Sequence, residues 1–242
     1  MKNLKVVQIN DLDLEKSEFV KGKINSRLIF FSHDKKFAYK IWDKNYLWAN
    51  LTEQGFHSNY YDNKLVPNFY ALIKDKEGCN RGYITRIVKS QQCLQNIEIS
   101  LLIKIIGLIK KRISLRDELK YRYKFSKKSL TKLLFTIFSR AVKTKRMFTD
   151  IGVNNFWTDG DSYYLFDLES CREFDYIFNK NTTDPEYINQ VRIRNNINKG
   201  LKTAIEKHEL IFPMRINKEE DLVKFWGKFI IVNNINYTKS FI

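Results

Sequence analysis

Cysteine, proline and glycine are all scarce in this sequence of 242 residues, which holds three, three and nine of them. Cys79, Cys93 and Cys171 lack the paired spacing of a zinc site, and their odd number does not suit a framework of disulfides. We therefore expect a protein of a reducing compartment. With so few prolines and glycines, no linker of that composition divides the chain.

Long apolar runs are missing as well. No uninterrupted apolar stretch reaches the roughly 20 residues that a membrane-spanning helix needs, and residues 1–16 lack the apolar core of a secretory signal peptide. Hydrophobic residues still make up 43% of the chain and aromatic residues 14%, which excludes a mainly disordered protein. The length suffices for one domain with a substantial core, and we expect a cytoplasmic location.

Acidic residues are too few to balance the basic ones, and the formal net charge is +16. Residues 104–146 contain fifteen Lys or Arg against two acids, a local charge of +13. We expect helices over 97–113 and 129–145, the second capped by Ser129. The basic segment has three interpretations: a solvated helix face, a surface for an anionic substrate or the inner face of a membrane, and nucleic-acid binding. Nucleic acid ranks lowest, because no recognisable nucleic-acid motif accompanies the charge.

The densest group of chemically useful side chains lies in residues 147–170. Asp150 and Asn155 are followed by a predicted hairpin, with turn-forming residues around Gly160, and the hairpin ends at Asp167. Phosphoryl transfer needs a positioned hydroxyl and neutralised charge, and magnesium prefers oxygen ligands. Asp150 is therefore predicted to position a hydroxyl, and Asn155 and Asp167 to hold Mg²⁺. Ordinary turn residues are the alternative.

Lys40 is the most informative residue of the first half of the chain. It stands among apolar residues of a predicted strand over 37–42, where an unpaired buried charge is costly. A predicted helix over 45–60 carries Glu53, and we expect a Lys40–Glu53 ion pair. The alternatives are an edge lysine facing solvent and a solvated glutamate.

Other predicted elements frame these residues. Two strands around a turn are expected over 18–31, and the small turn residues Gly22, Asn25 and Ser26 would let backbone N–H groups approach phosphates; a plain hairpin turn is the alternative. Further strands are predicted over 64–73 and 82–88, and late helices over 185–208 and 218–229.

This order of elements resembles the protein-kinase-like superfamily, and most closely its small-molecule branch: aminoglycoside and choline phosphotransferases and the kinases of lipopolysaccharide core sugars. The resemblance rests on Asp150, four intervening residues, Asn155, and a hairpin that ends in Asp167 after apolar residues. It implies an α+β, bilobal fold in one domain over 1–242. A small antiparallel sheet would form the first lobe over 1–88, and a mainly helical second lobe would span 89–242.

The resemblance also implies ATP and Mg²⁺ as cofactors. Lys40, supported by Glu53, would contact the α- and β-phosphates, with Gly22, Asn25 and Ser26 lying over them. Adenine would meet backbone groups at a hinge near Arg86, Ile87 and Val88.

Two departures from the family pattern bear on the substrate. Phe148 stands where a histidine usually precedes the catalytic aspartate, and Leu168 and Glu169 replace the Phe-Gly of typical protein kinases. No Ala-Pro-Glu-like element follows. We therefore expect an ATP-dependent phosphotransferase acting on a hydroxyl of a small molecule or glycan, such as a lipopolysaccharide core sugar. The alternatives are a pseudokinase acting as a binding scaffold and a protein Ser/Thr kinase.

Overall fold

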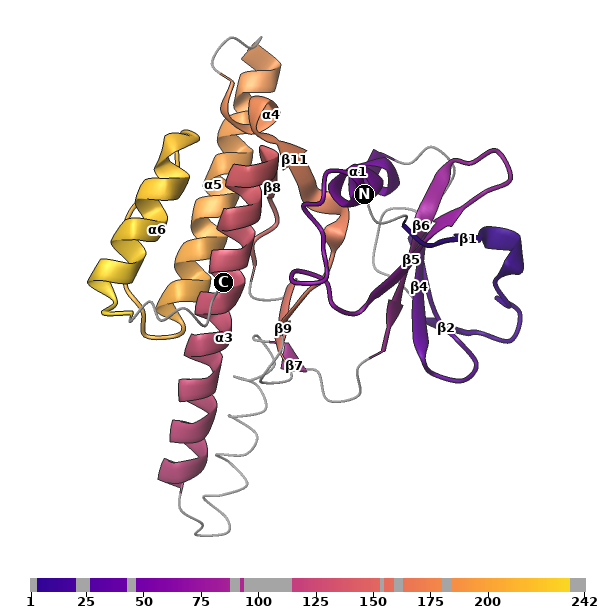
Figure 1. Ribbon diagram of the computed structural model, residues 1–242, viewed down its shortest axis with the longest axis horizontal. Helices are drawn as coiled ribbons and strands as arrows, with labels where there is room; N and C mark the ends of the chain where they lie inside the picture. The colour runs from indigo at the N-terminus through magenta and orange to yellow at the C-terminus, as the bar shows by residue number, and fades with distance from the viewer. Residues whose placement is uncertain are drawn as a thin grey trace. The chain divides into compact units, whose positions relative to one another are not determined.

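The computed structural model has an α+β fold with a six-stranded sheet, two small sheets and several helices (Figure 1). The structure describes residues 4–20, 27–42, 47–87, 92–93, 115–152, 155–158, 163–179 and 184–235. The chain divides into two compact units. The first unit comprises Met1–Ser90 with Leu168–Cys171, and the second comprises Gln91–Asp167 with Arg172–Ile242.

The first unit is built on the six-stranded sheet. Its strands are β1 (Val6–Gln8), β2 (Glu18–Val20), β3 (Arg27–Phe31), β4 (Phe37–Trp42), β5 (Phe69–Lys74) and β6 (Asn80–Arg86). They lie in the order β1-β5-β6-β4-β3-β2, and β1 alone runs parallel to its neighbour. The strand predicted over 37–42 is β4. Because β4 lies between β3 and β6, Lys40 is on a central strand, and the edge-lysine alternative is wrong.

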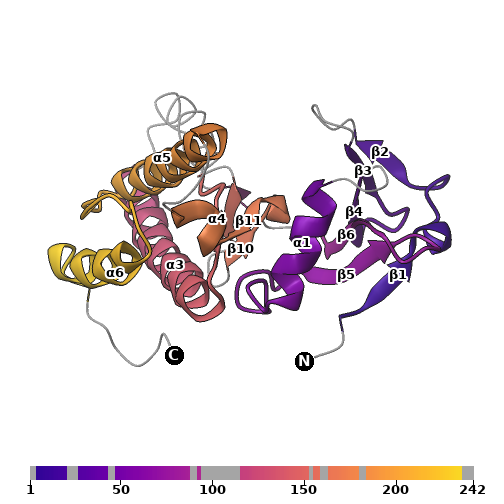
Figure 2. The same ribbon diagram turned by 90° about the horizontal axis from the view of Figure 1, so that it is seen from above.

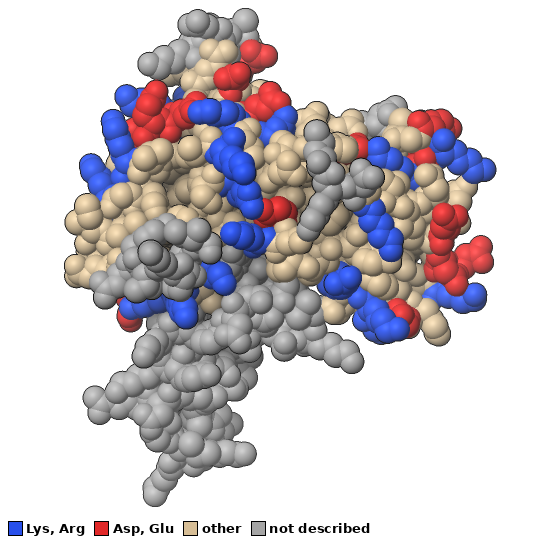
Figure 3. All heavy atoms as spheres, in the orientation of Figure 1, with Lys and Arg blue, Asp and Glu red and all other residues tan. Residues whose placement is uncertain are grey.

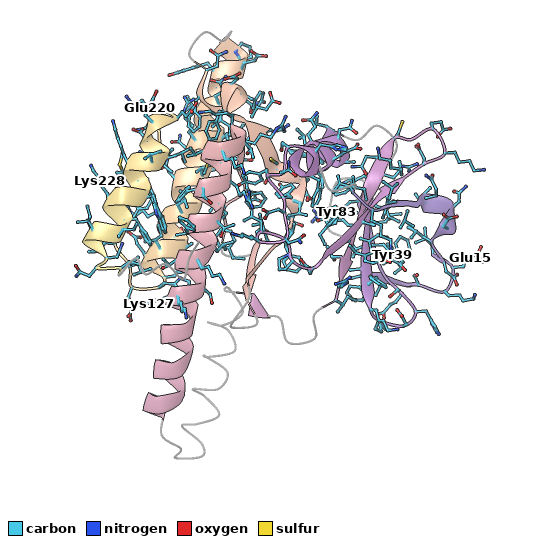
Figure 4. All side chains as sticks on the ribbon, in the orientation of Figure 1. Glu15, Tyr39, Tyr83, Lys127, Glu220 and Lys228 are labelled. Atoms are coloured by element: carbon cyan, nitrogen blue, oxygen red, sulfur yellow. The ribbon has the colours of Figure 1, made fainter. Side chains whose placement is uncertain are left out.

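The two faces of this sheet carry different residues, as the period of two along a strand requires. One face holds a buried apolar cluster that includes Ile41, Ile73 and Ile84, covered by the amino-terminal segment with the 3₁₀ turn η1 (Ile9–Asp11). Lys40 and Trp42 are on the other face, where Lys40 pairs in register with Tyr83. Figure 4 shows Tyr39 and Tyr83 on opposite faces.

Helix α1 (Leu47–His57) packs beside this second face (Figure 2). Its buried residues, among them Ala49 and Phe56, recur at helical spacing. It is shorter than the helix expected over 45–60, since Asn59 has a positive φ of 58° and ends the helical path. Gly55 leaves room for the ring of Tyr61, because a Cβ at Gly55 would lie 2.4 Å from a ring carbon.

The second unit is mainly helical. Its helices are α3 (Leu115–Thr144), α4 (Phe174–Phe178), α5 (Asp184–Glu206) and α6 (Glu220–Val232). One small sheet has the order β10-β9-β7, with β7 (Gln92–Cys93), β9 (Phe156–Thr158) and β10 (Tyr163–Leu165); another pairs β8 (Arg146–Phe148) with β11 (Cys171–Glu173). Helices α3 and α6 meet through Phe138 and Phe225, whose ring centroids lie 5.1 Å apart.

Two predictions for the basic segment concern its helices. Ser129 does not cap a helix, because α3 continues through it and its side chain is buried. The helix expected over 97–113 falls outside the described residues. Within the described part of the chain, no helix is long and apolar enough to cross a membrane.

Some of the described cations of this segment form ion pairs. Lys127 pairs with Glu209 at 3.0 Å, and Lys145 and Arg146 pair with Glu219 and Glu173. On the face shown in Figure 3, basic and acidic side chains alternate over the described surface. The membrane and nucleic-acid interpretations therefore stay predictions.

Candidate functional site

Lys40 is buried, with 7% of its surface exposed, and its ammonium is held by a carboxylate. Its Nζ lies 2.9 and 3.0 Å from the two side-chain oxygens of Glu169. The rings of Trp42 and Tyr83 lie 5.4 and 5.6 Å from the same nitrogen. A buried ammonium needs this kind of partner, because desolvation of an unpaired charge is costly. Lys40 is thus a fixed cation on the α1 side of the sheet.

A second cation joins the same carboxylate. Arg27, on the neighbouring strand β3, donates from Nη1 to Oε1 of Glu169 at 2.7 Å. Two positive charges therefore share one negative charge within the first unit. The group of Arg27, Lys40 and Glu169 is called here the cation cluster.

Glu169 lies in the 3₁₀ turn η3 (Leu168–Ser170), which belongs to the first unit. The Tyr61 hydroxyl donates a hydrogen bond to the backbone carbonyl of Leu168. Burial raises the pKa of Tyr61 well above its usual value, so this hydroxyl stays protonated and remains a donor. Leu168 and Ser170, on either side of Glu169, are buried. The carboxylate is therefore presented by a short, anchored turn.

The expected Lys40–Glu53 ion pair is wrong. Glu53 pairs instead with Lys74 at 2.5 Å and with Nε2 of His57 at 3.3 Å. Glu53 thus links α1 to the end of β5, and Lys40 finds its carboxylate 129 residues further along the chain. Sequence reasoning missed Glu169 because no local spacing connects a strand lysine to so distant a residue. The one available signal was the acidic side chain two residues after Asp167.

Asp150 and Asn155 are joined within the second unit. The backbone carbonyl of Asp150 accepts hydrogen bonds from the Gly152 N–H and from Nδ2 of Asn155, each at 3.1 Å. The Asn155 N–H in turn donates to the carbonyl of Gly152 at 3.0 Å. Asn155 is buried, and no described residue donates a hydrogen bond to its amide oxygen Oδ1. That oxygen is the end of the amide left to act as a ligand.

The hairpin expected after Asn155 is present as β9 and β10. Leu165 pairs with Phe156 across it, and the Phe166 N–H donates to the backbone carbonyl of Asn155 at 3.0 Å. Asp167 follows with a φ of +57°, a left-handed conformation that costs most residues on the order of 1–2 kcal/mol and that aspartate tolerates better. A residue stays in this conformation only where the surrounding structure enforces it.

A buried aromatic residue and helix α5 lie beside the loop that contains Asp150. Phe148, two residues before Asp150, is fully buried, so its aromatic ring serves as a core residue. Helix α5 approaches the loop so closely that a Cβ at Gly200 would lie 1.4 Å from the carbonyl oxygen of Ile151. Gly200 therefore allows direct backbone contact between α5 and the residue that follows Asp150.

The remaining predicted nucleotide contacts are only partly described. Gly22, Asn25, Ser26 and Val88 lie outside the described residues. The N–H groups of Arg86 and Ile87 donate to the carbonyls of Asn68 and Lys36, each at 2.8 Å. Backbone donors for adenine at these two positions are therefore already engaged within the sheet region.

A hollow of about 330 Å³ opens elsewhere on the second unit. Its lining comprises Thr144, Lys145, Arg146, Glu173, Phe174, Asp175 and Glu219. Both of its cations pair with glutamates of the same lining, so this hollow offers no uncompensated positive charge to an anionic ligand.

The ligand set fits magnesium bound together with a nucleotide. Among the described residues, no group of three or more His, Cys, Asp or Glu could hold a metal ion by itself. Asn155 and Asp167 supply one amide and one carboxylate, which is fewer than such a site needs. Magnesium commonly takes one or two carboxylates and completes its octahedron with phosphates and water, so the residues present fit that mode.

Comparison with models of known protein families gives no match for this chain, and comparison with curated proteins finds no relative.

Proposed function

We propose that this protein is an ATP-dependent phosphotransferase with a bilobal, kinase-like fold, and that its acceptor is a hydroxyl of a small molecule or glycan. Lipopolysaccharide core sugars belong to this acceptor class. ATP and Mg²⁺ are the proposed cofactors.

The observation that carries the proposal is the hydrogen bond from Asn155 Nδ2 to the Asp150 carbonyl. It ties the residue proposed to position the hydroxyl to the residue proposed to hold the metal. It also fixes which end of the amide faces other ligands, because Nδ2 is engaged and Oδ1 is not engaged by described donors.

The hairpin adds the second proposed metal ligand. Asp167 follows Phe166, whose N–H is bonded to the Asn155 backbone, so the carboxylate is tethered to the same loop. Asn155 and Asp167 would hold magnesium, which when bound neutralises charge on the phosphates.

The cation cluster supports binding of phosphate. Lys40 is buried and held by both oxygens of the Glu169 carboxylate, which also accepts a hydrogen bond from Arg27. A fixed cation of this kind stabilises phosphate oxygens without a large reorganisation. Asp150, exposed on its loop, would orient the acceptor hydroxyl and accept its proton.

Calorimetric titration of the purified protein with ATP, with and without Mg²⁺, tests the proposal. We expect magnesium-dependent binding that Asp167→Asn abolishes and that Lys40→Ala weakens at least about tenfold while leaving it measurable, whereas Lys74→Ala, which removes a cation of the same sheet, leaves it unchanged. Absence of binding by the wild-type protein would refute the assignment.

Turnover separates an enzyme from a binding scaffold. Release of ADP in the presence of a panel of sugars, aminoglycosides and amino alcohols should be lost in Asp150→Asn while Mg-ATP binding persists. Binding without ADP release for any acceptor would assign the chain to the pseudokinases, and autophosphorylation lost in Asp150→Asn would favour a protein kinase.

A further inference from the structure

We propose that Glu169, and not Glu53, is the positioning residue for Lys40, an inference that rests on the proposed nucleotide site. Both carboxylate oxygens of Glu169 contact the Lys40 ammonium, at 2.9 and 3.0 Å, and 13% of the Glu169 side chain is exposed. Glu53 is committed to Lys74 and His57. In the kinase-like pattern a glutamate of a helix pairs with the phosphate-binding lysine. Here Glu169, in the segment after Asp167, takes that role.

Arg27 and Tyr61 hold Glu169 and its turn in place independently of Lys40. Arg27 donates to the same oxygen that Lys40 contacts, Oε1, at 2.7 Å. Tyr61 anchors the carbonyl of Leu168, one residue before Glu169, and the ring of Tyr61 lies against Gly55 of α1. Helix α1 therefore acts on Lys40 through Tyr61 and η3, and not through its own glutamate.

This arrangement has a consequence for phosphate binding. A free lysine side chain loses rotational freedom when it engages a ligand, and a lysine already held in place avoids that loss at the moment of binding. Arg27 is the second cation on the same carboxylate, so Glu169 orients both Arg27 and Lys40. Glu169 also lies two residues after Asp167, so one short segment carries the proposed metal ligand and the partner of the phosphate-binding lysine.

A double-mutant cycle on the full chain tests this role. Glu169→Gln keeps the shape of the side chain and removes its charge, and we expect it to raise the Kd for Mg-ATP roughly tenfold or more, the size of a charge-assisted hydrogen bond. In the Lys40→Ala background the same change should have no further effect, because Glu169 acts through Lys40. Glu53→Gln, the matched control, should leave the Kd within about twofold of the wild-type value.

Tyr61→Phe provides a second variant that unpairs no charge. Loss of its hydroxyl frees the Leu168 carbonyl and loosens η3, so the Kd should rise a few-fold in the wild-type background and not in Lys40→Ala. This variant keeps the inference testable if Glu169→Gln fails to fold.

Acylation of Lys40 in the nucleotide-free protein, followed by mass spectrometry, measures the pairing separately. We expect faster labelling in Glu169→Gln and an unchanged rate in Glu53→Gln. Wild-type binding of Mg-ATP that is unaffected by Glu169→Gln and by Tyr61→Phe overturns the positioning role alone. Equal losses from Glu53→Gln and Glu169→Gln, or effects that persist in Lys40→Ala, also overturn it. A wild-type protein that does not bind Mg-ATP overturns both the positioning role and the proposed function, whatever the labelling shows.

Discussion

The side-chain amide of Asn155 donates to the backbone carbonyl of Asp150 over 3.1 Å, so the loop conformation and the orientation of the amide depend on one another. Asn155→Ala removes both the donor and the proposed ligand oxygen. We expect the Mg²⁺ concentration for half-maximal ATP binding to rise at least about tenfold, as is typical when groups around a metal are lost. Titration of Mg²⁺ at constant ATP measures this.

The matched control for that change is Asn195→Ala on α5, whose exposed side chain accepts a hydrogen bond from Arg215. It should leave the magnesium requirement unchanged. An equal shift in both variants would argue against a metal role for Asn155.

The positive φ of Asp167 predicts that glycine at this position gives a more stable protein than alanine does, the reverse of their order in a helix. Asp167→Gly and Asp167→Ala both remove the side chain, but only glycine adopts a φ of +57° at little cost. We expect the glycine variant to be more stable than the alanine variant by about 1 kcal/mol, measured by urea unfolding. Both should fail to bind Mg-ATP. An alanine variant as stable as the glycine variant would show that the backbone conformation is not enforced.

Gly200 predicts that a single methyl group disturbs the Asp150 loop. A Cβ at Gly200 would meet the Ile151 carbonyl oxygen, and overpacking against backbone costs about 1–3 kcal/mol. Gly200→Ala should therefore lower the free energy of unfolding and weaken Mg-ATP binding.

Gly227 on α6 is the control for helix propensity, because no described atom lies within 4 Å of a Cβ placed there. Gly227→Ala should raise the stability by up to about 1 kcal/mol. If both alanine variants were stabilised, the close approach of α5 to the loop would be refuted.

The turn between β3 and β4 predicts a pH dependence. Hydrogen bonds from the Ser32 hydroxyl and from Lys36, with the charge of Lys36, lower the pKa of Asp34 to about 2. Because this pKa lies below its unfolded value, the stabilisation is complete above about pH 4 and is lost as the pH falls through about 2. An NMR titration of the Asp34 carboxyl should show this pKa, and Ser32→Ala should raise it. A titration midpoint near 3.8, the ordinary value, would contradict these hydrogen bonds.

Local patterns predicted most elements of the sheet and the late helices. The strand expected over 37–42 has the bounds of β4, and the helix expected over 185–208 has nearly the bounds of α5. The apolar period of two or of 3.6 residues is a local property, and it survives folding because each element buries one side. The parallel strand β1 was not predicted, because three residues carry too little pattern and their partner β5 is distant in sequence.

The candidate site also has one part that the sequence predicts and one part that it does not. The Asn155 hairpin was predictable, since turn residues and two short apolar runs lie next to one another in the chain. The partner of Lys40 was not, because its identity depends on where η3 lies within the first unit rather than on spacing. Ser129 shows the converse failure: a good capping residue lies inside α3 because the flanking sequence continues the helix on both sides.

The most direct test of the central claim is calorimetric binding of Mg-ATP to the wild-type protein, Lys40→Ala and Asp167→Asn, with Glu53→Gln as the control. We predict a wild-type Kd between about 1 μM and 1 mM, the usual range for enzyme substrates. Binding should be lost in Asp167→Asn, weakened at least about tenfold in Lys40→Ala and retained in Glu53→Gln. No binding by the wild-type protein, or binding that both of the first two substitutions leave unchanged, would contradict the account.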